Sequence, residues 1–244
     1  MDQEKKRFLA KYRDHYQSTK SEHRPVPVLV PFAAIILLVV VAFLFLDNMA
    51  AGMRGRWPAW LVEWADRLTD VGASAWVIAL TTIVIIIAWS VRSWLSSETL
   101  GKISARAIAI ALYVLVSVGL AALIVNIIKR AVGRPRPVMF DDHGLFSLNP
   151  FTWNFDFESF PSGHATTNGA LFMALALLMP RIRYLLLLLG LCFALTRVFI
   201  GVHFPSDVTA GFGFGMWFAF ATAVWFSRYG ILFTQKDGTL ALKT

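Results

Sequence analysis

Residues 160–180 read FPSGHATTNGALFMALALLMP, a polar opening followed by an almost unbroken apolar run. Proline and serine at positions 161 and 162 are typical of the entry and N-cap of a helix, so we expect residues 164–180 to be helical. His164 then falls in the first turn, where free backbone N–H groups and the helix dipole form an anion site. The position of this titratable ring raises the question of which anion the helix end holds.

The composition of the whole chain indicates an integral membrane protein. Of its 244 residues, 57% are hydrophobic and 16% are charged, which is too apolar for a soluble domain of this length. A helix needs about 20 apolar residues to cross a bilayer core of about 30 Å. We therefore predict an all-α fold, a six-helix transmembrane bundle forming a single domain over residues 1–244. The predicted spans are 28–46, 72–91, 107–128, 164–180, 184–202 and 207–227.

The basic residues indicate how the bundle is oriented. The net charge is +8, and most of the 23 Lys and Arg residues lie in segments that a cytoplasmic N-terminus would place inside. The basic segment 1–27 is the largest of these, and its residues 4–20 suit either a short helix on the inner leaflet or a solvated tail. By the positive-inside rule we expect both termini in the cytoplasm and the first span retained as an anchor. The net positive charge is then explained by the lipid bilayer as partner, and we expect no nucleic-acid partner.

Aromatic residues between the first two predicted spans follow a helical repeat. Five apolar positions recur at i, i+3, i+4, i+7 and i+11, which is the spacing of one helical face. They are Trp57, Trp60, Leu61, Trp64 and Leu68. Because tryptophan favours the level of the lipid headgroups, we predict an interfacial helix on the outer side.

Two further segments bear on the outer face and on packing. Residues 137–161 form the longest outer loop, which is too interrupted to span the membrane and could cover a site. The last span carries Gly211, Gly213 and Gly215, a small-residue spacing that predicts close approach of helix backbones.

A basic cluster stands at the end of the third predicted span. Residues 129–137 read KRAVGRPRP, with Gly133 placed to end the helix and prolines that keep the following chain extended. Its cations are Lys129, Arg130, Arg134 and Arg136. Basic residues are ordinary at a helix C-terminus, so this cluster alone indicates no chemistry. We expect Arg130 and Arg134 to contact lipid headgroups or a second phosphate.

Another polar cluster separates the fifth and sixth predicted spans, where residues 196–207 read TRVFIGVHFPSD. An arginine such as Arg197 costs about 2.5–3.5 kcal/mol on insertion scales at the bilayer centre and less near an interface. We therefore expect something to pair with it. Gly201 is expected to break the helix.

The same cluster contains a histidine and an aspartate four residues apart. Ser206 or Asp207 is expected to cap the last helix. Asp207 can also return to His203 and hold one ring nitrogen protonated, which leaves the other nitrogen free as a nucleophile. The alternative is an aspartate that only caps, and the two roles are compatible.

Cations, helix-end amides and two histidines thus converge on one predicted face, the extracytoplasmic one. Such groups suit a phosphoryl group, whose transfer is catalysed mainly by positioning and electrostatic stabilisation. No cluster has the carboxylates expected of a magnesium site. We expect no metal and no other cofactor.

These clusters resemble the motifs of the type 2 phosphatidic acid phosphatase (PAP2) superfamily, K-x6-RP, PSGH and SR-x5-H-x3-D. Lys129 is followed after six residues by Arg136 and Pro137, and residues 161–164 match the second motif in full. The six-span layout is similar to the membrane branch of this superfamily.

The third motif is kept except at its first position. Arg197, His203 and Asp207 have the family spacing, whereas Thr196 stands where the family usually has serine. A hydroxyl is retained at this position, so the resemblance is little affected.

The resemblance implies a role for each site residue. His203 is expected to attack phosphorus and form a phosphohistidine, with Asp207 orienting its ring. His164 is expected to protonate the leaving oxygen and then activate a water molecule. The groups implied to hold the phosphate oxygens are Lys129, Arg136, Arg197, the hydroxyl of Ser162 and the N–H of Gly163.

The implied function is a metal-independent lipid phosphatase of a bacterial inner membrane. Isoprenyl diphosphate, phosphatidylglycerol phosphate, phosphatidic acid and lipid A phosphate are all chemically admissible substrates, and the sequence does not choose between them or indicate an oligomeric state. One alternative is a transferase that passes the phosphoryl group to a second lipid. An anion carrier built on buried arginines is a different class, but it leaves both histidines and Asp207 without a role.

Overall fold

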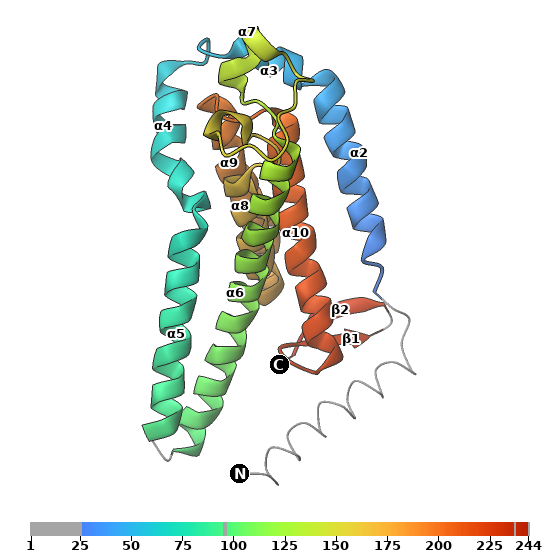
Figure 1. The fold of residues 1–244 in the computed structure, drawn as a ribbon. Helices are drawn as coiled ribbons and strands as arrows, with labels where there is room; N and C mark the ends of the chain where they lie inside the picture. Colours follow the sequence, from blue (N-terminus) through green and yellow to red (C-terminus); the bar gives the residue numbers. More distant parts are fainter. Residues whose placement is uncertain (1–25, 95–96, 237, 244) are drawn as a thin grey trace.

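The computed structural model describes residues 26–94, 97–236 and 238–243, so the predicted surface helix at 4–20 lies outside the described residues. Long helices run side by side and form an elongated bundle (Figure 1). The α-helices are α2 (Leu29–Phe45), α3 (Asp47–Met53), α4 (Ala59–Thr69), α5 (Ser74–Trp94), α6 (Glu98–Val132), α7 (Phe140–His143), α8 (Gly163–Leu178), α9 (Arg183–Phe199) and α10 (Pro205–Arg228). Short 3-10 helices are η1 (Asp70–Gly72), η2 (Pro137–Met139), η3 (Phe155–Phe157) and η4 (Pro180–Ile182).

Each predicted span coincides with a helix, and most boundaries agree within a few residues. The main difference is α6, which begins at Glu98 although the predicted span begins at 107. Its first turns are polar, with Ser97 as N-cap and an ion pair of 2.7 Å between Lys102 and Glu98. Hydropathy locates an apolar span, so it misses a helix that continues into a polar region.

The number of helices that can cross a membrane is smaller than predicted when length and composition alone are considered. Among the described residues, the stretches Ala59–Trp94, Glu98–His143, Pro180–Phe199 and Pro205–Arg228 qualify. The pair α2 and α3, bent by 49°, adds a fifth if it is one span. Helix α8 has 16 residues and falls below the length criterion.

A short hairpin at the end of the chain corrects the all-α prediction. Strand β1 (Phe233–Lys236) pairs antiparallel with β2 (Thr239–Leu242), and Gly238 between them has φ +74°. Phe233 is buried, and its ring centroid lies 5.0 Å from that of Tyr113 in α6. The strands have four residues each, too short for a clear alternating pattern, and packing against the bundle stabilises them.

Helix α8 packs against α6, α9 and α10 and lies in the core of the bundle. Its approach to α10 is close, because a Cβ atom added at Gly211 would lie 2.3 Å from the backbone oxygen of Ser162. One added at Gly215 would lie 2.1 Å from the oxygen of Thr166. The predicted close packing of the glycine-rich span is therefore confirmed, and it fixes the start of α8 against the start of α10.

The predicted aromatic helix is present as α4. Trp60 and Trp64 are exposed, as expected for a face turned towards lipid or solvent. The helix continues through η1 into α5 along one side of the bundle (Figure 1). The helical prediction is confirmed, whereas the position of α4 at a membrane interface stays a prediction.

Candidate active site

The ends of four helices meet at the end of the bundle that carries α3 and α7, which we call the site end (Figure 1). The last turn of α6 approaches the first turn of α8, since a Cβ atom at Gly163 would lie 3.9 Å from Lys129 Nζ. The Ser162 N–H donates to the Asp207 carbonyl at the start of α10 over 3.0 Å. Arg136 Nη1 donates to the Val202 carbonyl beyond α9 over 3.2 Å. Residues from all three sequence motifs are thus brought together.

The start of α8 has the predicted capped geometry. Ser162 has extended dihedral angles, and its Oγ accepts a long hydrogen bond of 3.4 Å from the Ala165 N–H. Gly163 and His164 follow in the first turn, where N–H groups have no partner within the helix. The charges of Arg197, Lys129 and Arg136 act on the His164 ring, and the Asp70 carboxylate opposes them. This ring therefore stands between a helix N-terminus and a cluster of cations, as an anion site requires.

The cations of the basic cluster divide into two groups. Arg134 is buried and forms ion pairs with Asp47 at 2.8 Å and Asp207 at 2.6 Å. Arg130 Nε lies 3.4 Å from Glu158 Oε1, and its guanidinium stacks 4.6 Å from the centroid of Trp153. The expected contacts of Arg130 and Arg134 with headgroups or a second phosphate are therefore wrong for Arg134, because protein carboxylates occupy its buried guanidinium.

The three motif cations have at most one long carboxylate contact within the described part of the chain. Lys129, Arg136 and Arg197 are all buried. Lys129 Nζ reaches Glu158 only at 4.0 Å, and Arg136 and Arg197 have no carboxylate within ion-pair distance. Burying cations is costly unless an anion compensates them. The motif positions therefore present positive charge that the nearby carboxylates compensate only in part, which suits a phosphate.

Arg136 also holds the surrounding loops. Its Nε donates to the Phe155 carbonyl over 2.9 Å, and its Nη1 and Nη2 donate to backbone carbonyls of Val202 and Glu158. The guanidinium stacks on the Phe155 ring at 3.7 Å from the centroid. Because a guanidinium carries five N–H groups, two of them remain available for a ligand. The loop 137–161 is thus tied to the site through Arg136, whereas its position on the outer side and a covering role stay predictions.

Arg197 is positioned by a residue that the sequence analysis did not single out. Its Nη1 donates to Thr69 Oγ1 at the end of α4 over 2.7 Å, and its buried Nε has no hydrogen-bond partner. Thr196 Oγ1 also lies 3.3 Å from Thr69 Oγ1. The expectation that something pairs with Arg197 is met by a hydroxyl, which leaves the positive charge available.

His203 lies in the turn between α9 and α10, after Gly201, whose φ of +72° confirms the predicted break. The ring is 3% exposed. Burial lowers the pKa of His203 to about 4, and the nearby Asp207 carboxylate opposes this shift. The ring is therefore neutral at neutral pH, the state that a nucleophile needs.

Asp207 stands beside this ring but is held by other groups. Its Oδ2 lies 3.8 Å from His203 Nδ1, too long for a hydrogen bond, and Nδ1 has no partner. Oδ2 instead accepts hydrogen bonds from Ser159 Oγ at 2.6 Å and the Phe204 N–H at 2.9 Å. The predicted cap is also shifted, because Pro205 opens α10 and Phe204 is the N-cap residue, with Asp207 in the first turn.

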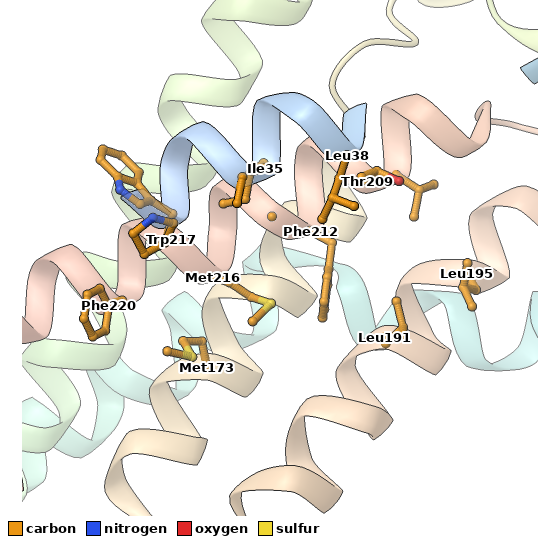
Figure 2. Close-up of a pocket in the computed structure, with 14 residues that line it drawn as sticks. Ile35, Leu38, Met173, Leu191, Leu195, Thr209, Phe212, Met216, Trp217 and Phe220 are labelled. Carbon is orange, nitrogen blue, oxygen red and sulfur yellow. The ribbon is translucent and has the colours of Figure 1, made fainter. Parts of the chain in front are cut away.

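An apolar groove lies away from this cluster. This groove of about 530 Å³ runs between α2, α8, α9 and α10, and its lining is apolar apart from Thr209 (Figure 2). It offers no charged or nucleophilic side chain. A second cavity of about 440 Å³ lies at the site end, and Arg54, Pro137 and Gly201 are among its lining residues. The side chains that could catalyse a reaction are therefore those of the polar cluster. The second cavity adjoins the loops that carry Arg136 and His203.

No group of three or more His, Cys, Asp or Glu residues in the described ranges could hold a metal ion. The groups gathered at the site end can bind an anion and supply a neutral imidazole nucleophile, and the charges of Arg136 and Arg197 act on both imidazoles, His203 and His164. This set of groups fits phosphoryl transfer.

Comparison with known proteins places the chain in a family. Residues 110–231 match the model of the PAP2 superfamily, and the chain belongs to this superfamily. It is 42% identical to a lipid A 1-phosphatase of Rhizobium etli over 200 residues, which cover 82% of this chain and 85% of the relative. A decaprenylphosphoryl-5-phosphoribose phosphatase of Mycobacterium tuberculosis is 43% identical over 91 residues, 36% of this chain and 46% of that protein.

A solved structure supports the fold. The crystal structure of the transmembrane PAP2-type phosphatidylglycerolphosphate phosphatase from Bacillus subtilis matches with a TM-score of 0.51 and 21% identity. The match covers 80% of this chain and 93% of the other. Family, relatives and fold agree that this protein is a membrane lipid phosphatase.

Proposed function

We propose that the chain removes the phosphate at position 1 of a lipid A-type glycolipid at the outer face of a bacterial inner membrane. The observation that carries a phosphate site is a set of three buried motif cations, Lys129, Arg136 and Arg197, of which only Lys129 has a carboxylate within ion-pair distance among the described residues, Glu158 at 4.0 Å. The choice of lipid rests on the relatives from Rhizobium, which align with most of this chain.

The proposed reaction begins with attack of the free His203 Nε2 on phosphorus. The N–P bond forms as the bond to the glycosyl oxygen breaks, and His164 gives that oxygen a proton. A bound phosphate favours the protonated His164 ring because of its negative charge. Water then attacks phosphorus, His164 takes its proton, and the N–P bond breaks to release phosphate and free His203.

The remaining residues hold the charge that moves during these steps. Asp207, 3.8 Å from His203 Nδ1, stabilises the positive charge that develops on the ring. The phosphate oxygens are held by Lys129, Arg136, Arg197, the Ser162 hydroxyl and the Gly163 N–H. Such donors lower the barrier because they are already oriented before the reaction.

Space beyond the phosphate supports a large headgroup. The cavity of about 440 Å³ adjoins Pro137, next to Arg136, and Gly201, two residues before His203. Arg54 lines this cavity and donates from Nη1 to the Pro137 carbonyl over 3.3 Å. A sugar headgroup can use such a mixture of polar and apolar walls.

For the membrane topology we propose six spans, with α8 as the fourth and α4 at the outer interface. The start of α8 lies beside the end of α6, and its other end joins η4 and α9. The chain therefore has to pass from the site end to the opposite end through α8, although this helix has 16 residues. Both termini then lie in the cytoplasm and residues 1–244 form one domain.

The test is phosphate release by the purified protein in detergent from lipid A, phosphatidic acid, phosphatidylglycerol phosphate and undecaprenyl diphosphate. We expect the highest kcat/KM with lipid A and no release by His203→Ala. Mass spectrometry of the product should show loss of the phosphate at position 1.

A higher kcat/KM with undecaprenyl diphosphate would overturn the choice of lipid and favour an isoprenyl substrate, in line with the relative from Mycobacterium tuberculosis. Turnover that requires a second lipid as acceptor would show a transferase. Phosphate release that persists in His203→Ala would remove the proposed nucleophile.

A further inference from the structure

A closed network of buried charges lies behind the proposed nucleophile. Arg134 donates from Nη2 to Asp47 Oδ2 over 2.8 Å, and from Nη1 to Asp207 Oδ1 over 2.6 Å and Ser206 Oγ over 2.7 Å. Ser206 Oγ in turn donates to Asp47 Oδ2 over 2.5 Å. All four residues are at most 4% exposed. One guanidinium therefore bridges two carboxylates out of contact with water.

This network joins segments that are far apart in the sequence. Asp47 lies at the corner where α2 bends by 49° into α3, and Arg134 follows the end of α6. Figure 1 shows α3 crossing the site end near the start of α10. The first apolar helix is thus connected to the turn that carries His203.

Asp47 also fixes the first turn of α10 directly. Its Oδ1 accepts a hydrogen bond of 2.9 Å from the Ser206 N–H, one of the donors that a helix N-terminus leaves free. A carboxylate is favourable at the positive end of a helix dipole. A residue from another helix therefore supplies the cap that Phe204, the local N-cap residue, cannot supply.

The two oxygens of Asp207 are oriented by groups other than His203. Oδ1 accepts from Arg134, and Oδ2 accepts from Ser159 and from the Phe204 N–H. The position of this carboxylate beside the imidazole is therefore set by its neighbours. Arg134 is the only charged side chain among these neighbours in the described residues.

We propose that Asp47 and Arg134 are positioning residues that hold Asp207 and the start of α10 in register with His203. This inference rests on the proposed function, in which His203 is the nucleophile. Neither residue occupies a position that the three motifs specify, and the hydrogen bonds of both side chains are made within the network. Their loss should therefore change the chemical step and leave substrate binding nearly unchanged.

The charge of the network should affect the pH at which His203 is protonated. A purely structural role of Asp47 and Arg134 would leave that pH unchanged. The charged groups that act on the His203 ring are Asp207, which favours its protonation, and Arg136 and Arg197, which oppose it. With Asp47 neutralised, Arg134 pairs with Asp207 alone, and the negative potential at the ring weakens. Protonation of His203 then requires a lower pH.

The test is Asp47→Asn, which keeps the shape and removes the charge. We expect kcat to fall roughly 10- to 100-fold, as for other residues that orient an active-site group, with KM within about twofold. The His203 ring, followed by NMR of histidine-labelled protein in detergent, should titrate at a lower pH than in the wild type. The matched control is Asp142→Asn, which removes an exposed carboxylate from α7 and should change neither value.

A second variant covers the case in which Asp47→Asn does not fold. Arg134→Lys keeps the charge, but an ammonium cannot bridge two carboxylates as a fork. It should give folded protein with the same loss of kcat at unchanged KM. Unchanged kcat in either folded variant, or a loss that only matches the loss of folded protein, would overturn the proposal.

The two proposals fail in different ways. If the wild type hydrolyses none of the lipids, the proposed function fails, yet the His203 titration still tests the coupling to Asp47. If lipid A is hydrolysed and the His203 titration is identical in Asp47→Asn and wild type, only the positioning role fails.

Discussion

Arg197 in α9 donates a hydrogen bond of 2.7 Å to Thr69 at the end of α4, and these two residues lie 128 positions apart in the sequence. The guanidinium of Arg197 is buried, and the Thr69 hydroxyl that accepts its hydrogen bond is neutral. A neutral partner orients the cation without cancelling its charge, so the charge remains available for a phosphate.

Thr69→Val should remove a contact that orients Arg197 and leave the charge of Arg197 in place. The substitution keeps the shape of the side chain and removes the acceptor, and a hydrogen bond to a charged group contributes about 1.5–3 kcal/mol. We expect kcat/KM for the lipid substrate to fall roughly 10- to 100-fold, a free-energy change of that size. Thr69→Ser, which keeps the hydroxyl, should stay within about threefold of wild type. Equal activity of the valine variant and the wild type would show that Arg197 is oriented by other contacts.

The two groups of cations should differ in activity. Lys129→Met removes a buried motif cation whose carboxylate partner, Glu158, lies as far as 4.0 Å away, and we expect kcat/KM to fall about 10²- to 10³-fold, as when one oriented donor is lost from an active site. Arg130→Met removes an adjacent cation that pairs with Glu158 and stacks on Trp153. Its kcat/KM should stay within about threefold. Losses of similar size in both variants would contradict the division of the cations into motif residues that bind phosphate and residues that pair within the protein.

The buried His203 ring should titrate in acid. Because the folded protein lowers the pKa of His203 from 6.5 to about 4, the ring is neutral above that value and becomes a cation only as the pH falls through it. The proposed nucleophile is therefore neutral across the neutral pH range. NMR of histidine-labelled protein, with His203→Asn to assign the signal, should give a midpoint well below 6.5. A midpoint at or above 6.5 would show that the ring is not buried as described.

Close contact between α8 and α10 should make one glycine indispensable. A Cβ atom at Gly215 would lie 2.1 Å from the backbone oxygen of Thr166, and backbone cannot give way as a side chain can. We expect Gly215→Ala to lower the free energy of unfolding by about 1–3 kcal/mol or more. Gly101→Ala is the matched control, since nothing lies within 4 Å of its Cβ position. It should stabilise α6 by about 0.5–1 kcal/mol. Thermal unfolding in detergent compares the two, and equal midpoints would contradict the close packing.

The helices and the motif residues could be predicted because their signals are local. Apolar runs locate spans, and Ser162, Gly133 and Gly201 mark the helix ends through their own dihedral preferences. The order of the predicted spans then placed Lys129 and His203 at the same end of the bundle.

Long-range partners left no local signal. Thr69, Glu158 and Asp47 reach the site from segments that only the packed bundle brings near it. Of these three residues, Asp47 could most easily have been recognised from the sequence, because a carboxylate at the end of an apolar helix requires a buried partner. The terminal hairpin was missed for a similar reason, since its four-residue strands depend on contacts of Phe233 with Tyr113.

The central claim is that phosphate passes through His203, and trapping the intermediate tests it most directly. A lipid substrate labelled with ³²P in the scissile phosphate is mixed with the wild type and, in parallel, with the His164→Ala variant, in which both steps are slowed, and the reaction is stopped in alkali within the first turnover. We expect an alkali-stable, acid-labile label that mass spectrometry assigns to His203, and no label in His203→Ala. Label on another residue, or wild-type turnover with no labelled protein under any quench, would contradict the account.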